Sequence, residues 1–259
     1  MKEYKLLFLF LIFFASGKVT CQEQQSPSIH SITFGIGVNW LKEENLFPIV
    51  HKGSNFGLTY KFEKKGNQFQ EVLVTIKYGK IKAELEKEKV SQNEQFDLQY
   101  SMGFHLINSE KIDLYLGYNL RYAYSLVEFP VWDESRAYWG TSLTLGLSNR
   151  LIIDITENQK WYFSWDINPI GLYSRPDEVR LYAQEEWTFP NIVRITNSGI
   201  KPGFIYNVFL SYFRTEYRFI TKKDRYFAFL YSLSYSRIQK TNEHPLLNSL
   251  NSLGISLGF

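Results

Sequence analysis

Large apolar residues recur at every second position over most of the chain. The clearest stretch is the last one, where Leu253, Ile255, Leu257 and Phe259 alternate with serine and glycine. Such period-two alternation predicts a β-strand with one apolar face and one small or polar face. Comparable segments predict about ten strands, over residues 29–41, 55–62, about 70–85, 96–106, 112–124, 139–155, 161–167, 203–220, 227–235 and 249–259.

The alternation is irregular in two of these segments. In the third, the apolar positions are even-numbered up to Tyr78 and odd-numbered from Ile81. That change of phase predicts a β-bulge near Gly79. The eighth segment is apolar on both faces in its first half, so its register stays open.

Two kinds of connection separate the segments. Short polar turns follow the second, fourth, sixth and eighth segments, at 63–67, 108–111, 156–160 and 221–225. The other connections are longer, at 42–54, 86–94, 128–138, 174–201 and 240–248. Short turns at one end and longer loops at the other resemble the pattern of outer-membrane barrels. The predicted fold class is therefore all-β, an antiparallel up-and-down transmembrane β-barrel of about ten strands, in preference to a lipocalin-like barrel or a sandwich.

The N-terminal residues 1–21 have the features of a signal peptide. Lys2 and Lys5 precede an apolar run over 6–15, and small residues follow it at a spacing suited to cleavage. The run is much shorter than the roughly 20 residues of a spanning helix. We therefore predict that residues 1–21 are removed and that residues 22–259 form the barrel domain.

The composition favours a membrane barrel and gives no support for a nucleic-acid partner. Aromatic residues make up 17% of the chain, with 18 Tyr and 21 Phe, and membrane barrels use aromatic residues in girdles at both interfaces. Loss of Lys2, Lys5, Lys18 and Glu3 with the signal peptide leaves 26 basic and 25 acidic residues. A chain so close to neutral offers no electrostatic attraction for nucleic acid.

The final strand, with its C-terminal aromatic residue, resembles the closing strand of bacterial outer-membrane β-barrels. The resemblance implies that this strand pairs with the first one and that barrel assembly machinery recognises Phe259. It also implies a place in the outer membrane of a Gram-negative bacterium, with outer-membrane lipid and lipopolysaccharide as partners.

Polar residues on the inward faces form a candidate lumenal network: Lys61, Lys77, Asp97, His105, Asp113, Arg121 and Asp166. Side chains largely fill the interior of a barrel of this size, so we favour a plug of ion pairs over a proton or ion path. The four histidines lack zinc spacing, and no HExxH, GxSxG or phosphate-loop motif occurs. No metal or cofactor is expected.

Two enzyme families with barrels of similar size offer comparisons. Omptin-type proteases have acidic rim residues, as Asp133, Glu134, Asp177 and Glu178 would provide here, but no Asp-x-His pair accompanies them. Residues 242–249 resemble the loop before the last strand of lipid A deacylase barrels. The catalytic His-x-Ser of that family does not carry over, because Tyr235-Ser236-Arg237 stands in its place. His244 and Ser249 are the alternative catalytic pair, although a serine needs a nearby base to act as a nucleophile.

Aromatic residues next to prolines mark the predicted outer loops: Trp132, Trp187 and Phe189. Such side chains bind partners or carbohydrate, and they also fill a barrel mouth or lie among lipid headgroups. The leading hypothesis is a non-enzymatic barrel that binds an extracellular ligand, supports the envelope or passes small solutes. The alternative is a lipid-modifying hydrolase of the lipid A deacylase type.

Overall fold

A computed structural model of the chain describes residues 28–43, 47–83, 90–128, 137–175, 191, 194, 196–197, 199–221, 225–240 and 244–259. The predicted signal peptide lies outside the described residues and stays a prediction. The strands are β1 (Ser28–Glu43), β2 (Phe47–Lys64), β3 (Gln68–Ala83), β4 (Val90–Asn108), β5 (Ile112–Glu128), β6 (Ala137–Thr156), β7 (Gln159–Ser174), β8 (Lys201–Gly203), β9 (Val208–Ile220), β10 (Tyr226–Ile238) and β11 (Leu246–Gly258).

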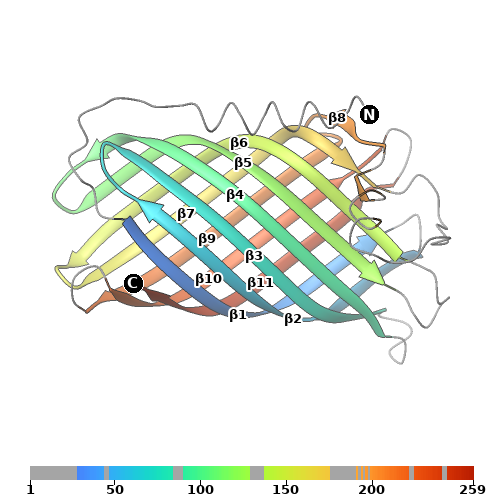
Figure 1. Cartoon of the computed structure of the whole chain (residues 1–259), viewed down its shortest axis with the longest axis horizontal. Helices are drawn as coiled ribbons and strands as arrows, with labels where there is room; N and C mark the ends of the chain where they lie inside the picture. Colours follow the sequence, from blue (N-terminus) through green and yellow to red (C-terminus); the bar gives the residue numbers. More distant parts are fainter. Residues whose placement is uncertain are drawn as a thin grey trace.

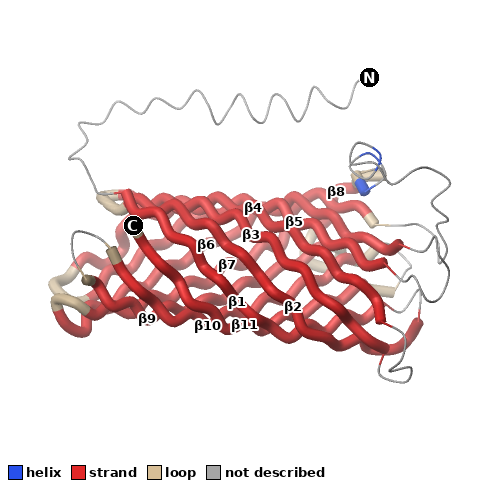
Figure 2. Tube along the Cα trace, turned by 60° about the horizontal axis from the view of Figure 1, so that its bottom comes forward, coloured by secondary structure: helices blue, strands red, loops and turns tan. Residues whose placement is uncertain are grey.

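The strands form one closed antiparallel sheet. Apart from β8 and β9, which do not pair with each other, consecutive strands of the chain pair, and β1 also pairs with β11, which closes the ring (Figures 1 and 2). β8 and β9 both pair with β7, so they occupy a single position in the wall. The described residues therefore form a barrel of ten strands, and the predicted fold class is confirmed.

The closing pair of strands has the predicted partners. β11 runs antiparallel to β1, and Gly254 lies opposite Gly35. Gly258 lies opposite Ser31, and Gly37 lies opposite Ser252. The seam is thus lined by small residues on its inward side, with glycine on both strands at only one level.

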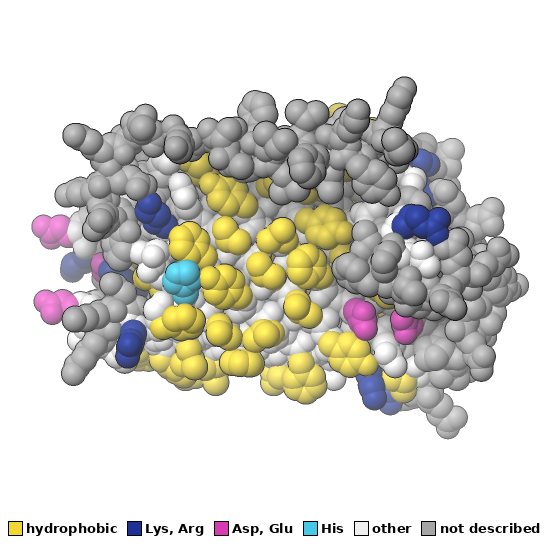
Figure 3. Space-filling model, viewed as in Figure 1, with side chains coloured by type: hydrophobic (Ala, Val, Ile, Leu, Met, Phe, Trp, Pro, Cys, Tyr) yellow, Lys and Arg dark blue, Asp and Glu magenta, His cyan; other side chains and the backbone are white. Residues whose placement is uncertain are grey.

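An apolar belt surrounds the barrel. Leucine, isoleucine and aromatic side chains on the outward faces are exposed, among them Phe56 at 70%, and Figure 3 shows them gathered over the middle of the wall. A continuous exposed apolar surface of this kind marks contact with a membrane. Excluding the three-residue β8, the strands are 13 to 20 residues long, whereas crossing a bilayer takes about 9–11. Within the described residues no helix is both long and apolar enough to cross a bilayer.

The two ends of the barrel differ. The turn end carries the short connections 65–67, 109–111, 157–158 and 221–225, and Ser28 and Phe259 also lie there (Figure 1). The loop end carries the remaining connections, the longest of which runs from Ser174 to Lys201. In outer-membrane barrels the short turns face the periplasm, so the loop end is the outer end.

The predicted bulge near Gly79 is wrong. β3 pairs with β2 and β4 without a break there, with Gly79 opposite both Asn55 and Asn93. A Cβ at Gly79 would lie 2.4 Å from a backbone oxygen of β2, so glycine permits this close approach. The apolar residue Ile81 breaks the sequence pattern because it faces the interior, where it is buried at the loop end.

The predicted connection 42–54 is also wrong, because β1 extends to Glu43 and β2 begins at Phe47. Beyond the belt, the outward residues of β2 are polar, as Lys52 and Ser54 show, so hydrophobic alternation no longer marks the strand. The eighth predicted strand is divided at residues 204–207. There the backbone N–H groups of Asn207 and Val208 donate to the carbonyl of Phe204 at 2.6 and 2.8 Å.

Candidate functional site

The half of the lumen nearer the turn end, called here its lower half, is lined by charged residues. They occupy alternate positions along their strands. On β9, Arg214, Glu216 and Arg218 all face inward and are buried. On β2, Lys61 and Glu63 do the same. Period-two geometry brings charges at alternate positions to one face, so each of these strands presents a row of charge to the interior.

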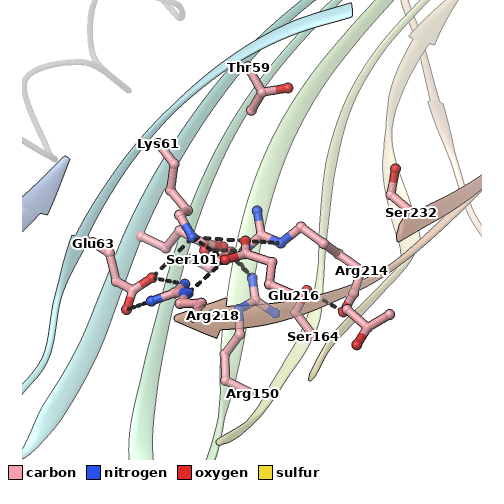
Figure 4. A network of polar contacts seen from close by, with 12 residues as sticks. Thr59, Lys61, Glu63, Ser101, Arg150, Ser164, Arg214, Glu216, Arg218 and Ser232 are labelled. Atoms are coloured by element: carbon pink, nitrogen blue, oxygen red, sulfur yellow. Dashed lines mark hydrogen bonds and ion pairs between the residues drawn. The ribbon is translucent and has the colours of Figure 1, made fainter. Parts of the chain in front are cut away.

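The charges of β2 and β9 pair across the lumen. The Lys61 Nζ donates to both carboxylate oxygens of Glu216, at 2.8 and 2.9 Å. Arg218 donates through Nε to Glu216 at 2.8 Å and through Nη2 to Glu63 at 2.8 Å. Figure 4 shows these side chains pointing toward one another from two separate parts of the wall.

Glu71 of β3 extends the contacts to the remaining walls. It accepts a hydrogen bond from Arg150 of β6 at 2.8 Å and a second one from Arg214 of β9. Arg150 also donates to Asp166 of β7 at 2.7 Å. Because β3 and β9 lie five positions apart in a ring of ten, the Glu71–Arg214 pair connects opposite sides of the barrel.

These contacts form one network, called here the ion-pair network. Among the described residues, four buried cations meet four buried carboxylates in it: Lys61, Arg150, Arg214 and Arg218 with Glu63, Glu71, Asp166 and Glu216. The partly exposed Lys65 adds a contact to Glu63 at 3.3 Å from the turn end. Buried charges need partners because desolvation disfavours an isolated ion. The equal numbers satisfy that requirement, and the side chains occupy the lumen from wall to wall.

A smaller ionic group lies nearer the loop end. Arg121 donates to Asp97 through Nε at 3.1 Å and Nη2 at 2.8 Å, and the Nζ of Lys77 is 3.9 Å from the same carboxylate. The Arg121 guanidinium also lies 5.2 Å from the ring centre of Tyr212, which projects from β9. Asp97 and its two cations therefore form a second polar layer, called here the Asp97 triad.

Two cavities lie above the ion-pair network. The lower cavity, of about 30 Å³, is bordered by Lys61 and Glu216 and reaches Lys77. The upper cavity, of about 50 Å³, is bordered by Asp97 and Arg121 and by serines of β10. The Asp97 triad contributes to the walls of both cavities.

An apolar cluster closes the interior toward the loop end: Leu41, Ile81, Val127, Tyr138, Tyr173, Val208, Leu210, Ile238 and Leu246. These residues face inward at the loop-end parts of their strands, and several of them line the upper cavity. The lumen is therefore ionic in its lower half and apolar near its outer mouth.

No family model matches the sequence, and no curated protein matches it. Solved structures do match. The outer membrane protease OmpT from Escherichia coli superimposes with a TM-score of 0.52 over 93% of this chain and 99% of that chain, at 6% sequence identity. The fold is that of a bacterial outer-membrane β-barrel.

Other matches are weaker. The translocator domain of the autotransporter NalP from Neisseria meningitidis covers 99% of this chain and 95% of that chain, with a TM-score of 0.42 and 6% identity. At such identities, likeness extends to the fold alone. The expected similarity to lipid A deacylase-type barrels is not shown by these matches.

The predicted lumenal residues of this outer-membrane barrel fall into three groups. Lys61 and Asp166 belong to the ion-pair network, and Lys77, Asp97 and Arg121 form the Asp97 triad. His105 and Asp113 lie apart at the turn end, where the His105 Nε2 is 3.5 Å from an Asp113 oxygen. The His105 ring stacks on Tyr115 at 3.9 Å, so this pair is a local contact at the rim.

Sequence reasoning missed six members of the ion-pair network: Glu63, Glu71, Arg150, Arg214, Glu216 and Arg218. The sequence pattern places Glu63 in a turn, and it leaves the register of the eighth segment open. A usable signal was present in that segment, because Arg214, Glu216 and Arg218 recur with period two. Opposite charges at alternate positions would have set the register with the charged face inward.

Of the remaining predicted site residues, the structure describes only His244 and Ser249. The loop aromatics Trp132, Trp187 and Phe189, and the rim carboxylates Asp133, Glu134, Asp177 and Glu178, lie outside the described residues. Of the alternative catalytic pair, Ser249 lies on the outward side of β11, opposite Trp40 and Tyr235. His244 precedes that strand, and its carbonyl accepts a hydrogen bond from Arg175 at 2.7 Å. Ser249 is three residues into β11 from Leu246, about 10 Å along the strand, so the two residues lie at different heights.

In the part of the chain that the structure describes, no group of three or more His, Cys, Asp or Glu side chains is arranged to hold a metal ion.

Proposed function

We propose that this outer-membrane barrel does not conduct and that it acts through its outer face, by binding an extracellular ligand with its loops. The observation that carries the proposal is the ion-pair network. It joins opposite walls of the lumen through buried side chains, of which Lys61 is 2% exposed and Glu216 1%. Ions crossing the barrel would have to displace several mutually paired charges at once, at a large free-energy cost.

The apolar cluster supports the same conclusion from the other end of the lumen. It lies between the upper cavity and the outer mouth, and an apolar constriction opposes the entry of hydrated ions. With the interior filled at two levels, the connections of the loop end are the surface that faces extracellular molecules. The longest of them, between Ser174 and Lys201, far exceeds the turn between Thr156 and Gln159.

Conductance in planar lipid bilayers tests the first half of the proposal. The wild-type barrel should show no stable unitary conductance. A charge-neutral variant with Glu71, Arg150, Arg214 and Glu216 all replaced by serine should conduct, because it removes two cations and two carboxylates from the network. The matched control replaces Asp154 and Lys160, a half-exposed pair at the turn end joined at 2.8 Å. This control should stay closed, and stable wild-type conductance would refute the proposal.

The second half is tested by binding. The wild-type barrel, displayed on cells, is applied to an array of immobilised glycans in parallel with a variant carrying alanine at Trp132, Trp187 and Phe189. We expect binding that the variant loses. If the variant binds as well as the wild type, these aromatics are not the contact surface, and the conductance result is unaffected.

A further inference from the structure

The Asp97 triad carries one more positive charge than negative. Its two cations, Lys77 and Arg121, share the single carboxylate of Asp97. Arg121 donates twice to one oxygen of that carboxylate, whereas the Lys77 Nζ is 3.9 Å from the other oxygen, beyond hydrogen-bond distance. Among the described residues no other carboxylate lies within ion-pair distance of Lys77. Lys77 is therefore a buried cation without a carboxylate of its own.

Lys77 and Asn55 border the lower cavity from neighbouring strands. Lys77 of β3 stands opposite Gly57 of β2, and Asn55 lies two residues from Gly57 on the same inward face. A Cβ at Gly57 would lie 3.3 Å from the Lys77 Cγ, so glycine leaves space for the lysine stem. Asn55 is buried, and within the described part of the chain its Nδ2 has no hydrogen-bond partner. An ammonium group and an unpaired amide N–H thus border the same space.

The remaining polar groups around the lower cavity add more donors than acceptors. Of the described residues that border it, Glu216 alone has a carboxylate, and Lys61, Arg214 and Arg218 already contact that group. The hydroxyls of Thr59 and Thr75 are 3.0 Å apart, and the bond between them uses one of their two O–H groups. Figure 4 shows Thr59 on the wall beyond the ion-pair network. The lining therefore has donors to spare, which is what a bound anion requires.

The size of the lower cavity selects a small ion. One water molecule takes up about 10–15 Å³ of such a cavity. A volume of about 30 Å³ therefore accommodates one monoatomic anion and excludes a tetrahedral oxyanion such as sulfate. A buried cation without a partner either loses its proton or takes up a counter-charge. Loss of the proton would leave the amide of Asn55 without an acceptor, whereas an anion would satisfy both groups.

We propose that the lower cavity holds one chloride ion, bound by the ammonium group of Lys77 and the amide of Asn55. With the ion, the Asp97 triad has as many negative charges as positive ones. The cavity lies between the ion-pair network and the apolar cluster, so the ion becomes enclosed when the barrel closes. It is a resident ion that stabilises the folded state, and its site is independent of any ligand of the outer loops.

The chloride dependence of unfolding tests the proposal on the whole barrel in lipid vesicles. Unfolding is followed by urea titration at constant ionic strength, with chloride exchanged for gluconate, which is too large for the cavity. One ion bound to the folded state alone multiplies the folded-to-unfolded ratio by about ten for each tenfold rise in chloride above the dissociation constant. The wild type should follow that slope. Bromide should replace chloride, and sulfate should not.

Two substitutions distinguish a bound ion from a structural role of the same side chains. Lys77→Met removes the cation in excess, and Asn55→Asp supplies a carboxylate of nearly the same shape in place of the ion. Both variants should lose the chloride dependence, and Asn55→Asp should remain stable without chloride. The matched control is Lys160→Met, which removes a partly exposed lysine at the turn end and should keep the full chloride dependence.

Crystals of the barrel refolded in bromide locate the ion directly by anomalous scattering. We expect a peak in the lower cavity beside Lys77 and Asn55. Peaks at the surface alone would mean an adventitious ion only and would overturn the proposal. A wild type that does not respond to chloride, an equal effect of sulfate, or a Lys77→Met variant with unchanged chloride dependence would also overturn it. Should Lys77→Met fail to fold, the wild-type slope and the position of the bromide peak still decide.

Discussion

Replacing Glu216 with glutamine tests whether the ion-pair network is held together by its charge balance. Glu216 accepts from Lys61 at 2.8 and 2.9 Å and from Arg218 at 2.8 Å, and it lies 3.2 Å from the Arg214 Nε. Glutamine has nearly the same shape but no charge. The variant therefore leaves four buried cations with three carboxylates.

The size of the effect follows from the contacts that remain. Breaking a buried ion pair by removing one partner costs about 3–5 kcal/mol, because an uncompensated charge stays buried. Here Lys61 and Arg218 keep Glu63, and Arg214 keeps Glu71. Since no cation loses its last partner, we expect the lower end of the range, about 3 kcal/mol. Lys61→Met should cost a similar amount, because it leaves one carboxylate in excess.

The double variant Lys61→Met, Glu216→Gln gives the decisive measurement. It restores equal numbers of cations and carboxylates, so its loss should be smaller than the sum of the single losses by up to about 3 kcal/mol. The free energy of unfolding is measured by urea titration in lipid vesicles, with tryptophan fluorescence as the signal. If the losses add within about 0.5 kcal/mol, the two residues are not coupled and the reasoning from charge balance is refuted.

Three further predictions concern other parts of the barrel. Lys65, in the turn after β2, has its pKa lowered to about 8 from 10.5, chiefly by burial. Between these pH values the unfolded chain binds more protons than the folded one, so the free energy of unfolding should rise from about pH 8 to about pH 10.5. The Lys65→Met variant should lack this rise, and identical pH dependence of the two proteins would disprove the prediction. Leu116→Arg places charge on the lipid face, where the side chain is 43% exposed, and should cost about 2–4 kcal/mol near the midplane. Ser234→Asn, directed into the upper cavity, adds only a neutral polar group to a polar lumen and should cost less by the same urea assay, and the reverse order would show that the assigned faces are wrong. Deleting Phe259 should reduce the amount of heat-modifiable barrel in outer-membrane fractions, and normal assembly of the shortened chain would count against recognition of this residue.

The hydrophobic pattern of the sequence predicted the strands and their faces correctly in the parts of the barrel where one face meets lipid. The alternation of Leu253, Ile255 and Leu257 predicted the faces of β11, because a shift of one residue would turn every large residue inward. The pairing of β11 with β1 followed from the resemblance to the closing strands of outer-membrane barrels. The pattern was insufficient beyond the bilayer. There Lys52 is outward and Ile81 inward, so the usual assignment of apolar residues to the outer face no longer applies.

The lumenal contacts were only partly predictable, for a different reason. Period two identifies which charges face inward, and Lys61 and Asp166 were placed by it. It does not identify partners, because Lys61 and Glu216 are 155 residues apart and their strands are not neighbours in the sheet. Which inward charges meet depends on the tilt and number of strands in the closed ring, and those quantities follow from the whole sheet.

That separation along the chain also has a kinetic consequence. Glu71 and Arg214 are 143 residues apart and bring together strands from the two halves of the sequence. Such contacts form only after a long loop has closed, so they should be absent from the transition state for folding. Substitutions at these positions should then have φ-values near zero, accelerating unfolding while leaving the folding rate almost unchanged. The charges that fill the lumen would thus set how long a finished barrel lasts in the membrane, and contribute little to how fast it forms.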